Sequence, residues 1–234
     1  MALMTSLPPN YRALVIGSNG SIGSAFVQSL ALDPSCAAVE QLSRATTPGF
    51  DLNNEQSVED SLAPFKAQGG FDLIIDATGA LVLKGVGPEK SLNALKASNF
   101  DEALWVNCIG PTVMLKNLVP LLKQNRCIYA KLSARVGSIS DNKLGGWYSY
   151  RASKAAFNMV LQTAAIEHHR KNPQSIFVAL QPGTVASKLS APFVAQSKTL
   201  TPQDSVLQML ASLDQLTPSG RAQFIDYKGA PIAW

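Results

Sequence analysis

Charged residues are scarce in this sequence. Only 15% of its 234 residues are Asp, Glu, Lys or Arg, whereas 46% are apolar. A chain of this balance can bury a large core, which excludes a disordered or polyelectrolyte protein. The 20 basic and 16 acidic residues leave a net charge of only +4, without a dense run of Lys or Arg. We therefore expect no nucleic-acid partner.

Cysteine, histidine and long apolar runs are also scarce. Cys36, Cys108 and Cys127 lie far apart and include no C-x-x-C pair, which favours free thiols in a reducing cytosol. His168 and His169 are too few for a metal site, and we expect them at a solvated helix end. No uncharged apolar run reaches the roughly 20 residues that span a bilayer, and we find no secretion signal in the first ten residues. These absences predict a cytoplasmic protein with no membrane partner and no metal.

Short apolar runs alternate with helical patterns along the chain. This order predicts an α/β protein in one domain, residues 1–234, with a parallel sheet of about seven strands and helices on both faces. The predicted strands are 12–17, 37–43, a weak strand ending at Asp51-Leu52, 71–79, 127–133, 175–183 and 220–227. The predicted helices are 21–32, 55–68, 100–124, 149–171 and 202–213.

The stretch "VIGSNGSIGSAF" places Gly17, Gly20 and Gly23 between the first strand and its helix. Glycines there allow a tight turn and close approach of a pyrophosphate to the free N–H groups of the helix start. The spacing is G-x-x-G-x-x-G, which differs from the strict Rossmann fingerprint. A glycine-rich turn can also be purely structural, but the strand before it and the helix after it favour a nucleotide site.

Ser43 and Arg44 close the second strand, where an acidic residue would bind the ribose 2′-hydroxyl of a dinucleotide. No acid lies beside them, and Glu40 comes too early in the strand. A guanidinium suits a phosphate, so the sequence favours NADP(H) over NAD(H). The alternative is a solvated Arg in a loop.

Tyr150 and Lys154 lie four residues apart in "YSYRASKAAF", so a helix places both on one face. A nearby ammonium favours the phenolate, and we expect it to lower the pKa of Tyr150 below its ordinary value of about 10. Such a phenol can protonate a carbonyl oxygen. A lone Tyr-x-x-x-Lys pattern is more often an ordinary surface pair, so this pattern alone does not establish a site.

In combination, these motifs resemble the short-chain dehydrogenase/reductase family over nearly the whole chain. "DATG" at Asp76–Gly79, "VNCIG" around Asn107 and "PGTVAS" from Pro182 fall in the family's order. "GGWYSYRASKAAFNM" and the ending "FIDYKGAPIAW" resemble its C-factor-like branch. The resemblance implies a Rossmann fold and hydride transfer between NADP(H), or alternatively NAD(H), and a carbonyl or alcohol. It also implies a homodimer or homotetramer that packs the helices 100–124 and 149–170.

The resemblance also assigns roles to residues. Tyr150 would be the acid/base, Lys154 would hold the ribose and tune Tyr150, and Asn107 would keep a helix kink and a water for proton relay. Asp51 would contact adenine, and Pro182, Gly183 and Ser187 would bracket the nicotinamide amide. The expected cofactor-binding residues are Gly17, Ser18, Gly20, Ser21, Ile22, Gly23, Ser43, Arg44, Asp51, Leu52, Ala77, Gly79, Lys154, Pro182, Gly183, Val185 and Ser187.

The sequence departs from the family pattern at three places. Ser21 stands for the second family glycine, which we expect to be tolerated because Gly20 is adjacent. The usual N-N-A-G reads Asp76-Ala77-Thr78-Gly79, which alters a structural turn. In "AKLSARVGSIS", Ala134 stands where the family has its catalytic serine.

The stretch offers three serines, Ser133, Ser138 and Ser140, that could replace the missing hydroxyl. Side chains alternate along a strand, so Ser133 should point away from the site unless the strand has already ended. Ser138 lies in a loop that can turn its hydroxyl inward, and we predict Ser138 as the fourth catalytic residue beside Tyr150, Lys154 and Asn107. The alternative is that no serine takes this role.

Two functions follow. The first is an NADP(H)-dependent carbonyl reductase that acts on a small-molecule carbonyl or alcohol, which the Tyr150, Lys154 and Asn107 motifs favour. The second is an NAD(P)-binding signalling or regulatory protein with weak or no catalysis, which Ala134 and the C-factor-like motifs favour. No G-x-S-x-G motif occurs, which excludes a hydrolase with a nucleophile elbow.

Overall fold

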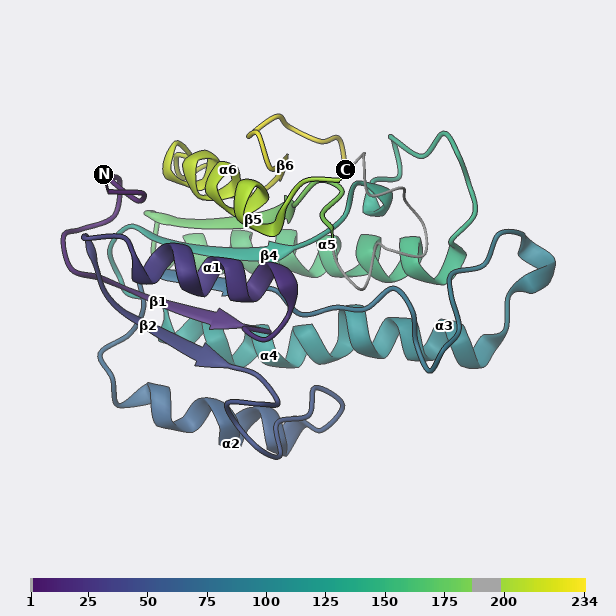
Figure 1. Cartoon of the computed structure of the whole chain (residues 1–234), viewed down its shortest axis with the longest axis horizontal. Coiled ribbons are helices and arrows are strands. Elements are labelled where there is room, and N and C mark those ends of the chain that lie inside the picture. The colour runs from purple at the N-terminus through teal and green to yellow at the C-terminus, as the bar shows by residue number, and fades with distance from the viewer. Residues whose placement is uncertain (1, 187–198) are drawn as a thin grey trace.

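A parallel β-sheet lies at the centre of the protein (Figure 1). The computed structural model describes residues 2–186 and 199–234, and in these residues the sheet has six strands in the order β2-β1-β3-β4-β5-β6. All neighbouring strands are parallel, which confirms the predicted α/β class. The strands are β1 (Tyr11–Ile16), β2 (Cys36–Leu42), β3 (Leu73–Asp76), β4 (Cys127–Leu132), β5 (Ser175–Gln181) and β6 (Ala222–Asp226). The helices are α1 (Ser21–Ala31), α2 (Glu55–Lys66), α3 (Ala97–Leu104), α4 (Gly110–Leu118), α5 (Tyr148–His169) and α6 (Pro202–Asp214).

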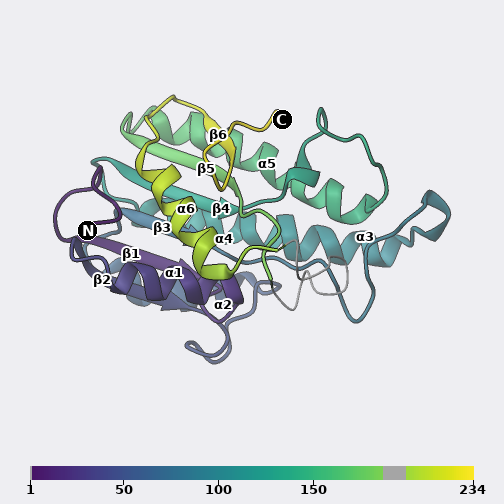
Figure 2. The same ribbon diagram turned by 45° about the horizontal axis from the view of Figure 1, so that its top comes forward.

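The helices cover both faces of the sheet, as predicted. Figures 1 and 2 show α1 and α6 on one face and α4 and α5 on the other. The alternation of strand side chains explains the two layers, because Ala13 and Val15 enter the core under α1 and α6 while Leu14 and Ile16 enter the core under α4 and α5. Burial of these two apolar cores is the main source of stability.

The predicted weak strand that ends at Asp51-Leu52 is wrong, and its absence explains why the sheet has six strands and not about seven. The segment forms turns between β2 and α2. Pro48 lacks an N–H for a sheet ladder, and Gly49 has a φ of +90°. The Ser57 hydroxyl of α2 holds the turn, because it donates to the Gly49 carbonyl at 2.6 Å and accepts from the Asp51 N–H at 2.9 Å.

The predicted single helix 100–124 is also wrong in its course. It begins earlier, at Ala97, and a π-helical turn, Trp105–Ile109, separates α3 from α4. The helix then ends at Leu118 and continues only as a short 3₁₀ turn containing Pro120. Single π turns often mark functional sites, and this one contains the buried Asn107. The resemblance implies a helix kink at Asn107, and the structure has a π turn at this position.

The C-terminal end of α5 is less solvated than the sequence suggested. His168 is buried, and its ring lies 5.5 Å from the Phe177 ring between ring centres. The expectation of two solvated histidines is therefore wrong for His168, because α5 packs this face onto β5. Burial lowers the pKa of His168.

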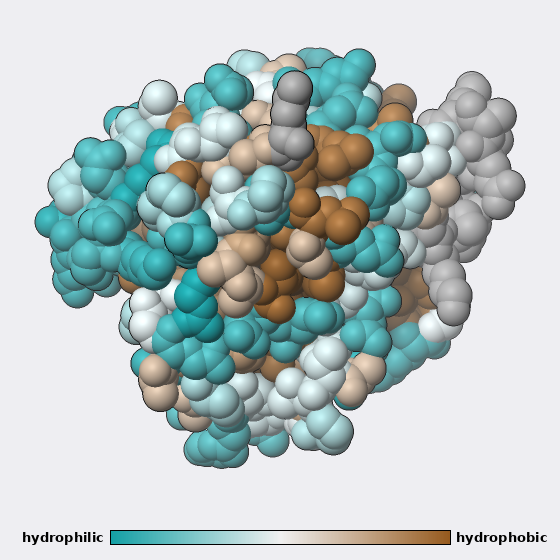
Figure 3. All heavy atoms as spheres, turned by 60° about the vertical axis from the view of Figure 1, so that its left-hand side comes forward, coloured by the Kyte–Doolittle hydropathy of each residue, from teal (hydrophilic) through white to brown (hydrophobic). Residues whose placement is uncertain are grey.

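The surface on the N-terminal side is mixed in polarity. Figure 3 shows a small apolar area near the centre of this face, surrounded by hydrophilic side chains. Among the described residues, no helix combines the length and the apolar character needed to cross a membrane.

Candidate functional site

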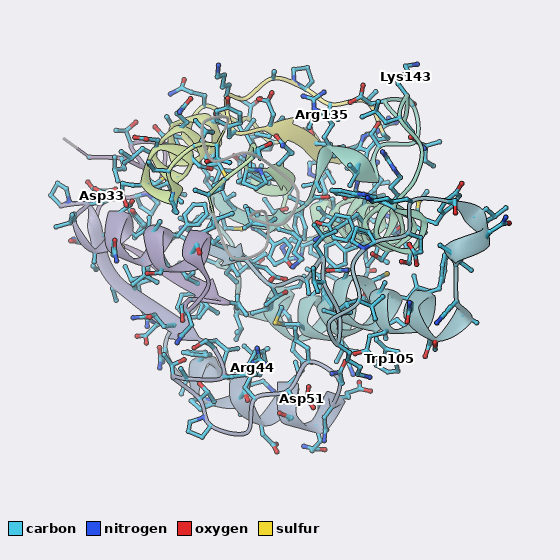
Figure 4. All side chains as sticks on the ribbon, turned by 45° about the vertical axis from the view of Figure 1, so that its right-hand side comes forward. Asp33, Arg44, Asp51, Trp105, Arg135 and Lys143 are labelled. Atoms are coloured by element: carbon cyan, nitrogen blue, oxygen red, sulfur yellow. The ribbon has the colours of Figure 1, made fainter. Side chains whose placement is uncertain are left out.

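The carboxyl ends of β1, β2 and β3 surround a cavity of about 650 Å³. Ligands of open parallel sheets bind at this end of the strands. Figure 4 shows Arg44 and Asp51 near each other on the same side of the molecule. The cavity brings together eight of the predicted cofactor-binding residues: Gly17, Gly20, Ser43, Arg44, Asp51, Leu52, Ala77 and Gly79.

The glycine turn is as tight as its sequence predicts. Gly17 has a φ of +76°, and a Cβ at this position would lie 3.0 Å from the Ala77 carbonyl. A Cβ at Gly23 would overlap the Gly17 carbonyl, so the start of α1 packs directly on the turn. Ser21 is the first residue of α1, whose first turn contains no acidic side chain. The helix N-terminus is therefore suited to an anion.

Ser18 provides an independent indication of a ligand. Its hydroxyl oxygen is buried, and within the described part of the chain it has no hydrogen-bond partner. A buried unpaired hydroxyl costs about 1–3 kcal/mol. The residues present therefore fit the diphosphate of a dinucleotide, which would supply the missing partner. Ile22, in the first turn of α1, packs against the core.

Ser43 and Arg44 occupy different positions at the cavity. Ser43 is buried, and its hydroxyl donates to Asn19 Oδ1 at 2.6 Å and lies 3.0 Å from the Thr46 hydroxyl. Ser43 therefore ties the Arg44 loop to the glycine turn. The exposed Arg44 lines the cavity. Asn19 also lines the cavity and was missed from the sequence, although its place between the family glycines could have indicated it.

Tyr150 and Lys154 lie on one face of α5, as their spacing predicts. The Lys154 ammonium is buried and donates to the Leu132 carbonyl at 3.4 Å. A Cβ on Gly79 would lie 3.0 Å from Lys154 Nζ and 3.1 Å from Asn107 Oδ1. Gly79, with a φ of +139°, is therefore the point where the cavity meets Lys154 and Asn107. Burial and the Lys131 ammonium lower the pKa of Lys154 to about 7, and Asp76 partly opposes this shift.

The expected lowering of the pKa of Tyr150 is wrong for this structure. Burial raises the pKa of Tyr150 to about 12. The Lys154 ammonium lies over the Tyr150 ring, 5.7 Å from its centre. The desolvation of the phenol therefore outweighs any help from Lys154 here.

Asn107 fixes the loop that follows β3. Its side-chain oxygen accepts from the Ala80 N–H at 2.9 Å, and its side-chain nitrogen donates to the Ala80 carbonyl at 2.9 Å. Asn107 is fully buried. It therefore connects the π turn to the Gly79 corner of the cavity.

The three serines of "AKLSARVGSIS" are all engaged with protein groups, and the Ser140 hydroxyl donates to the Trp234 carbonyl at 2.7 Å. The Ser133 hydroxyl donates to Asn158 Oδ1 at 2.8 Å and so faces α5, the helix that carries Lys154. Because β4 ends at Leu132, the alternation of strand side chains does not fix the direction of Ser133.

Ser138 is buried, and its hydroxyl accepts from the Asp141 N–H at 3.0 Å. Ala134 precedes a short 3₁₀ turn, Arg135–Gly137. The Ser138 oxygen thus closes its own loop.

The strand β5 leads into the remaining predicted cofactor residues. The Pro182 carbonyl accepts from the Ser205 hydroxyl at 2.6 Å, and Gly183 has a φ of +78° beside the Tyr227 ring. Val185 is buried and forms an isolated bridge with Leu200. Ser187 lies outside the described residues. The cavity residues of β1 to β3 and the residues after β5 therefore come from different strand ends of one sheet.

A smaller cavity of about 160 Å³ lies beside Tyr150. Leu81, Leu83 and Val86 from the loop after β3 line it, together with Ser149. The sequence did not indicate this loop as part of the site, because its residues carry no recognisable motif.

A six-stranded parallel sheet with a glycine turn at the end of β1 defines the Rossmann class of α/β protein. The family model for short chain dehydrogenase matches residues 12–198. The chain therefore belongs to the short-chain dehydrogenase family of oxidoreductases.

Two relatives and two solved structures illustrate this membership. The chain is 31% identical to a 1-hydroxy-2-glutathionyl-2-methyl-3-butene dehydrogenase of Rhodococcus sp. (strain AD45), over 80% of this chain and 79% of that protein. It is 34% identical to C-signal of Myxococcus xanthus, over 62% of this chain and 84% of that protein. The carbonyl reductase Sniffer of D. melanogaster has the same fold, with a TM-score of 0.80 and 20% identity over 96% of this chain and 99% of that one. The NADPH-bound carbonyl reductase from chicken fatty liver also has this fold, with a TM-score of 0.80 and 24% identity over 97% and 100% of the two chains.

Proposed function

We propose that this protein is an NADPH-dependent reductase of small carbonyl compounds. The observation that carries the proposal is the meeting of Lys154 Nζ and Asn107 Oδ1 at Gly79, where the cofactor-sized cavity reaches the catalytic helix. A cofactor in that cavity would have its reactive end beside α5. The bound cofactor would supply a hydride to the carbonyl carbon.

The chain's own residues would bind the cofactor and move a proton. The start of α1 and the Ser18 hydroxyl would hold the diphosphate, and the exposed Arg44 would hold a 2′-phosphate. Lys154 would bind ribose hydroxyls. The Tyr150 hydroxyl would donate its proton to the carbonyl oxygen as negative charge develops there.

The substrate would be small and would carry both apolar and polar groups. The cavity beside Tyr150 holds about 160 Å³, and its walls include the apolar Leu81, Leu83 and Val86 as well as the polar Asn99 and Glu102. A mixed lining of this kind favours an aldehyde or ketone with a short hydrocarbon group and a further polar group.

The direct test is the consumption of NADPH with a panel of small aldehydes and ketones, with the alcohol product identified by mass spectrometry. The proposal expects turnover that produces one alcohol for each NADPH consumed. The absence of turnover across the panel would contradict it.

A signalling role without catalysis is the alternative, and Ala134 favours it. C-signal, one of the relatives, carries a signalling name. This alternative expects NADPH binding without turnover for every carbonyl, and the same panel therefore separates the two functions.

We further propose a homodimer or homotetramer that packs α4 and α5 against their copies. A cavity of about 470 Å³ lies between these helices, and Leu115, Val119 and the exposed Met159 line it. Light scattering coupled to gel filtration should give a mass of two or four chains, and a mass of one chain would contradict this proposal.

A further inference from the structure

The sheet contains a buried ion pair that the site described above does not use. Lys131 in β4 and Asp76 in β3 are register partners in neighbouring strands, and their side chains are 1% and 0% exposed. Lys131 Nζ donates to Asp76 Oδ1 at 2.9 Å. Removing two charges from water costs several kcal/mol per ion, so such a pair needs further hydrogen bonds.

Those further hydrogen bonds come from the turn after β3. Lys131 Nζ also donates to the Thr78 carbonyl at 2.6 Å and to the Thr78 hydroxyl at 2.8 Å. Asp76 Oδ1 accepts from the Thr78 N–H at 2.9 Å, and Asp76 Oδ2 accepts from the Tyr129 hydroxyl at 3.2 Å. Both carboxylate oxygens and the ammonium thus have partners, which offsets part of the cost of burying the two groups. Burial lowers the pKa of Lys131, and Asp76 partly opposes this effect.

This network lies directly beside Lys154. Thr78 precedes Gly79, the residue next to Lys154 Nζ. Lys154 Nζ donates to the carbonyl of Leu132, the residue after Lys131. Lys131 Nζ also lies 5.7 Å from the ring centre of Phe157, which is one helical turn after Lys154 on α5. The two buried ammonium groups therefore approach the Thr78–Gly79 turn from β4 and from α5.

We propose that Lys131 and Asp76 form a positioning pair, which holds the Thr78–Gly79 turn at the cavity and sets the charge state of Lys154. The inference rests on the proposed function, because it concerns the lysine that would bind the cofactor ribose. It extends that function to two residues that would act only through Lys154.

The titratable groups that face Lys154 come from three elements. Lys131 on β4 repels a positive charge on Lys154, Asp76 on β3 attracts it, and the Tyr150 ring lies beside it on α5. Replacing Lys131 alone removes the repulsion and leaves the attraction of Asp76. Lys154 should then hold its proton to a higher pH. Replacing both members removes both effects, so the result should lie between that of wild type and that of the single variant.

The test measures the titration of Lys154 in the cofactor-free protein by NMR of lysine labelled with ¹³C at Cε. The Lys154 resonance is assigned as the one that Lys154→Met removes. We expect Lys131→Gln to raise the midpoint by at least about 0.5 pH unit, the size of effect typical of a nearby charge at a buried site. The Asp76→Asn/Lys131→Gln double variant should titrate between wild type and Lys131→Gln, and Lys131→Arg should stay close to wild type.

If Lys131 and Asp76 only hold the turn in place, the Lys154 midpoints of the variants should follow a different order. Loosening of the turn would hydrate Lys154 most in the double variant, so a midpoint at or above that of Lys131→Gln would overturn the proposal. An unchanged midpoint in Lys131→Gln would also overturn it. If Lys131→Gln does not fold, the Lys154 midpoints of Lys131→Arg and of the double variant are compared instead. The proposal requires a higher midpoint in the double variant, and equal midpoints would overturn it.

The second measurement is the pH dependence of kcat/KM for carbonyl reduction. The midpoint of its acid limb should shift among the variants in the same order as the Lys154 midpoint. A wild type without any turnover would contradict the proposed function, whereas the NMR order would still decide the inference about Lys131 and Asp76.

Discussion

Lys154 Nζ lies 5.7 Å from the centre of the Tyr150 ring and is buried beside the Gly79 turn and the Leu132 carbonyl. A charged lysine in such a place is unfavourable without its ligand. Burial accordingly lowers the pKa of Lys154 to about 7, well below its ordinary value. The burial of Lys154 therefore lowers the stability of the cofactor-free protein, and a bound ribose would offset this loss.

This cost predicts the pH dependence of stability. Between about pH 7 and the ordinary lysine pKa, the unfolded chain binds the Lys154 proton and the folded chain does not, so the stability of the cofactor-free protein should rise with pH. Lys154→Met should remove this rise and stabilise the protein at pH 7 by up to about 4 kcal/mol. Urea unfolding from pH 6.5 to 9.5 measures both effects. Lys143→Met, at an exposed loop position, is the matched control and should leave the slope unchanged. A parallel slope in Lys154→Met and wild type would contradict the prediction.

Arg44 should determine the choice of cofactor. Its exposed guanidinium at the cavity can pair with a 2′-phosphate, which NADH lacks. Arg44→Ala should weaken NADPH binding about tenfold, equivalent to about 1.4 kcal/mol, and leave NADH binding nearly unchanged. Fluorescence titration with both cofactors measures this, with the exposed Arg221→Ala as the control. Equal NADPH and NADH affinities in wild type would show that Arg44 does not have this role.

Ala134 and Ser138 should reveal whether a third hydroxyl takes part. Ala134→Ser restores the missing family hydroxyl with little added volume, and it should raise the rate of reduction by up to about tenfold. Ser138→Ala should lower the rate if Ser138 already supplies this hydrogen bond, and then Ala134→Ser should give no gain. Steady-state kinetics of the two variants measure this. Unchanged rates in both would refute a catalytic role for Ser138.

Glu89 should stabilise the start of α5. Its buried carboxylate accepts from the Ser149 hydroxyl at 2.6 Å and from the Ser149 N–H at 3.2 Å. Burial raises the pKa of Glu89, but these hydrogen bonds outweigh it and lower the pKa overall, so the stabilisation is present above the ordinary Glu pKa and is lost in acid. Glu89→Gln should cost about 1 kcal/mol at pH 7 and lower kcat, because Tyr150 follows Ser149 directly.

Urea unfolding and steady-state kinetics measure the two effects of Glu89→Gln. Glu167→Gln, at an exposed position near the other end of α5, is the control. If both variants behaved like wild type, Glu89 would have no role at the helix start.

The parts of the site that depend on local chain geometry could be predicted from the sequence. Glycines between a strand and a helix, such as Gly17, predict a tight turn from the local sequence alone. The four-residue spacing of Tyr150 and Lys154 places both side chains on one face of any helix. The structure has both features as expected. The Asp51-Leu52 strand could not be excluded from the apolar pattern, because the Ser57 contacts that hold the turn come from a separate helix.

Features that depend on pairing between strands of the sheet could not be predicted from the sequence. Lys131 and Asp76 are 55 residues apart, and only the register of β3 and β4 brings them together. The pKa of Tyr150 was expected to fall because the sequence reveals the neighbouring lysine but not the burial of the phenol. Long-range contacts and desolvation therefore account for what the sequence could not supply.

The central claim is that the Tyr150 hydroxyl donates the proton in carbonyl reduction. Tyr150→Phe keeps the ring and removes only this hydroxyl, so its kcat should fall by at least about a hundredfold while its Kd for NADPH stays within about twofold of wild type. The measurement is single-turnover oxidation of bound NADPH by the best carbonyl of the panel, with Tyr148→Phe as the control. Loss of turnover in Tyr150→Phe alone is the predicted result, and a Tyr150→Phe protein that retains most of the wild-type rate would contradict the account.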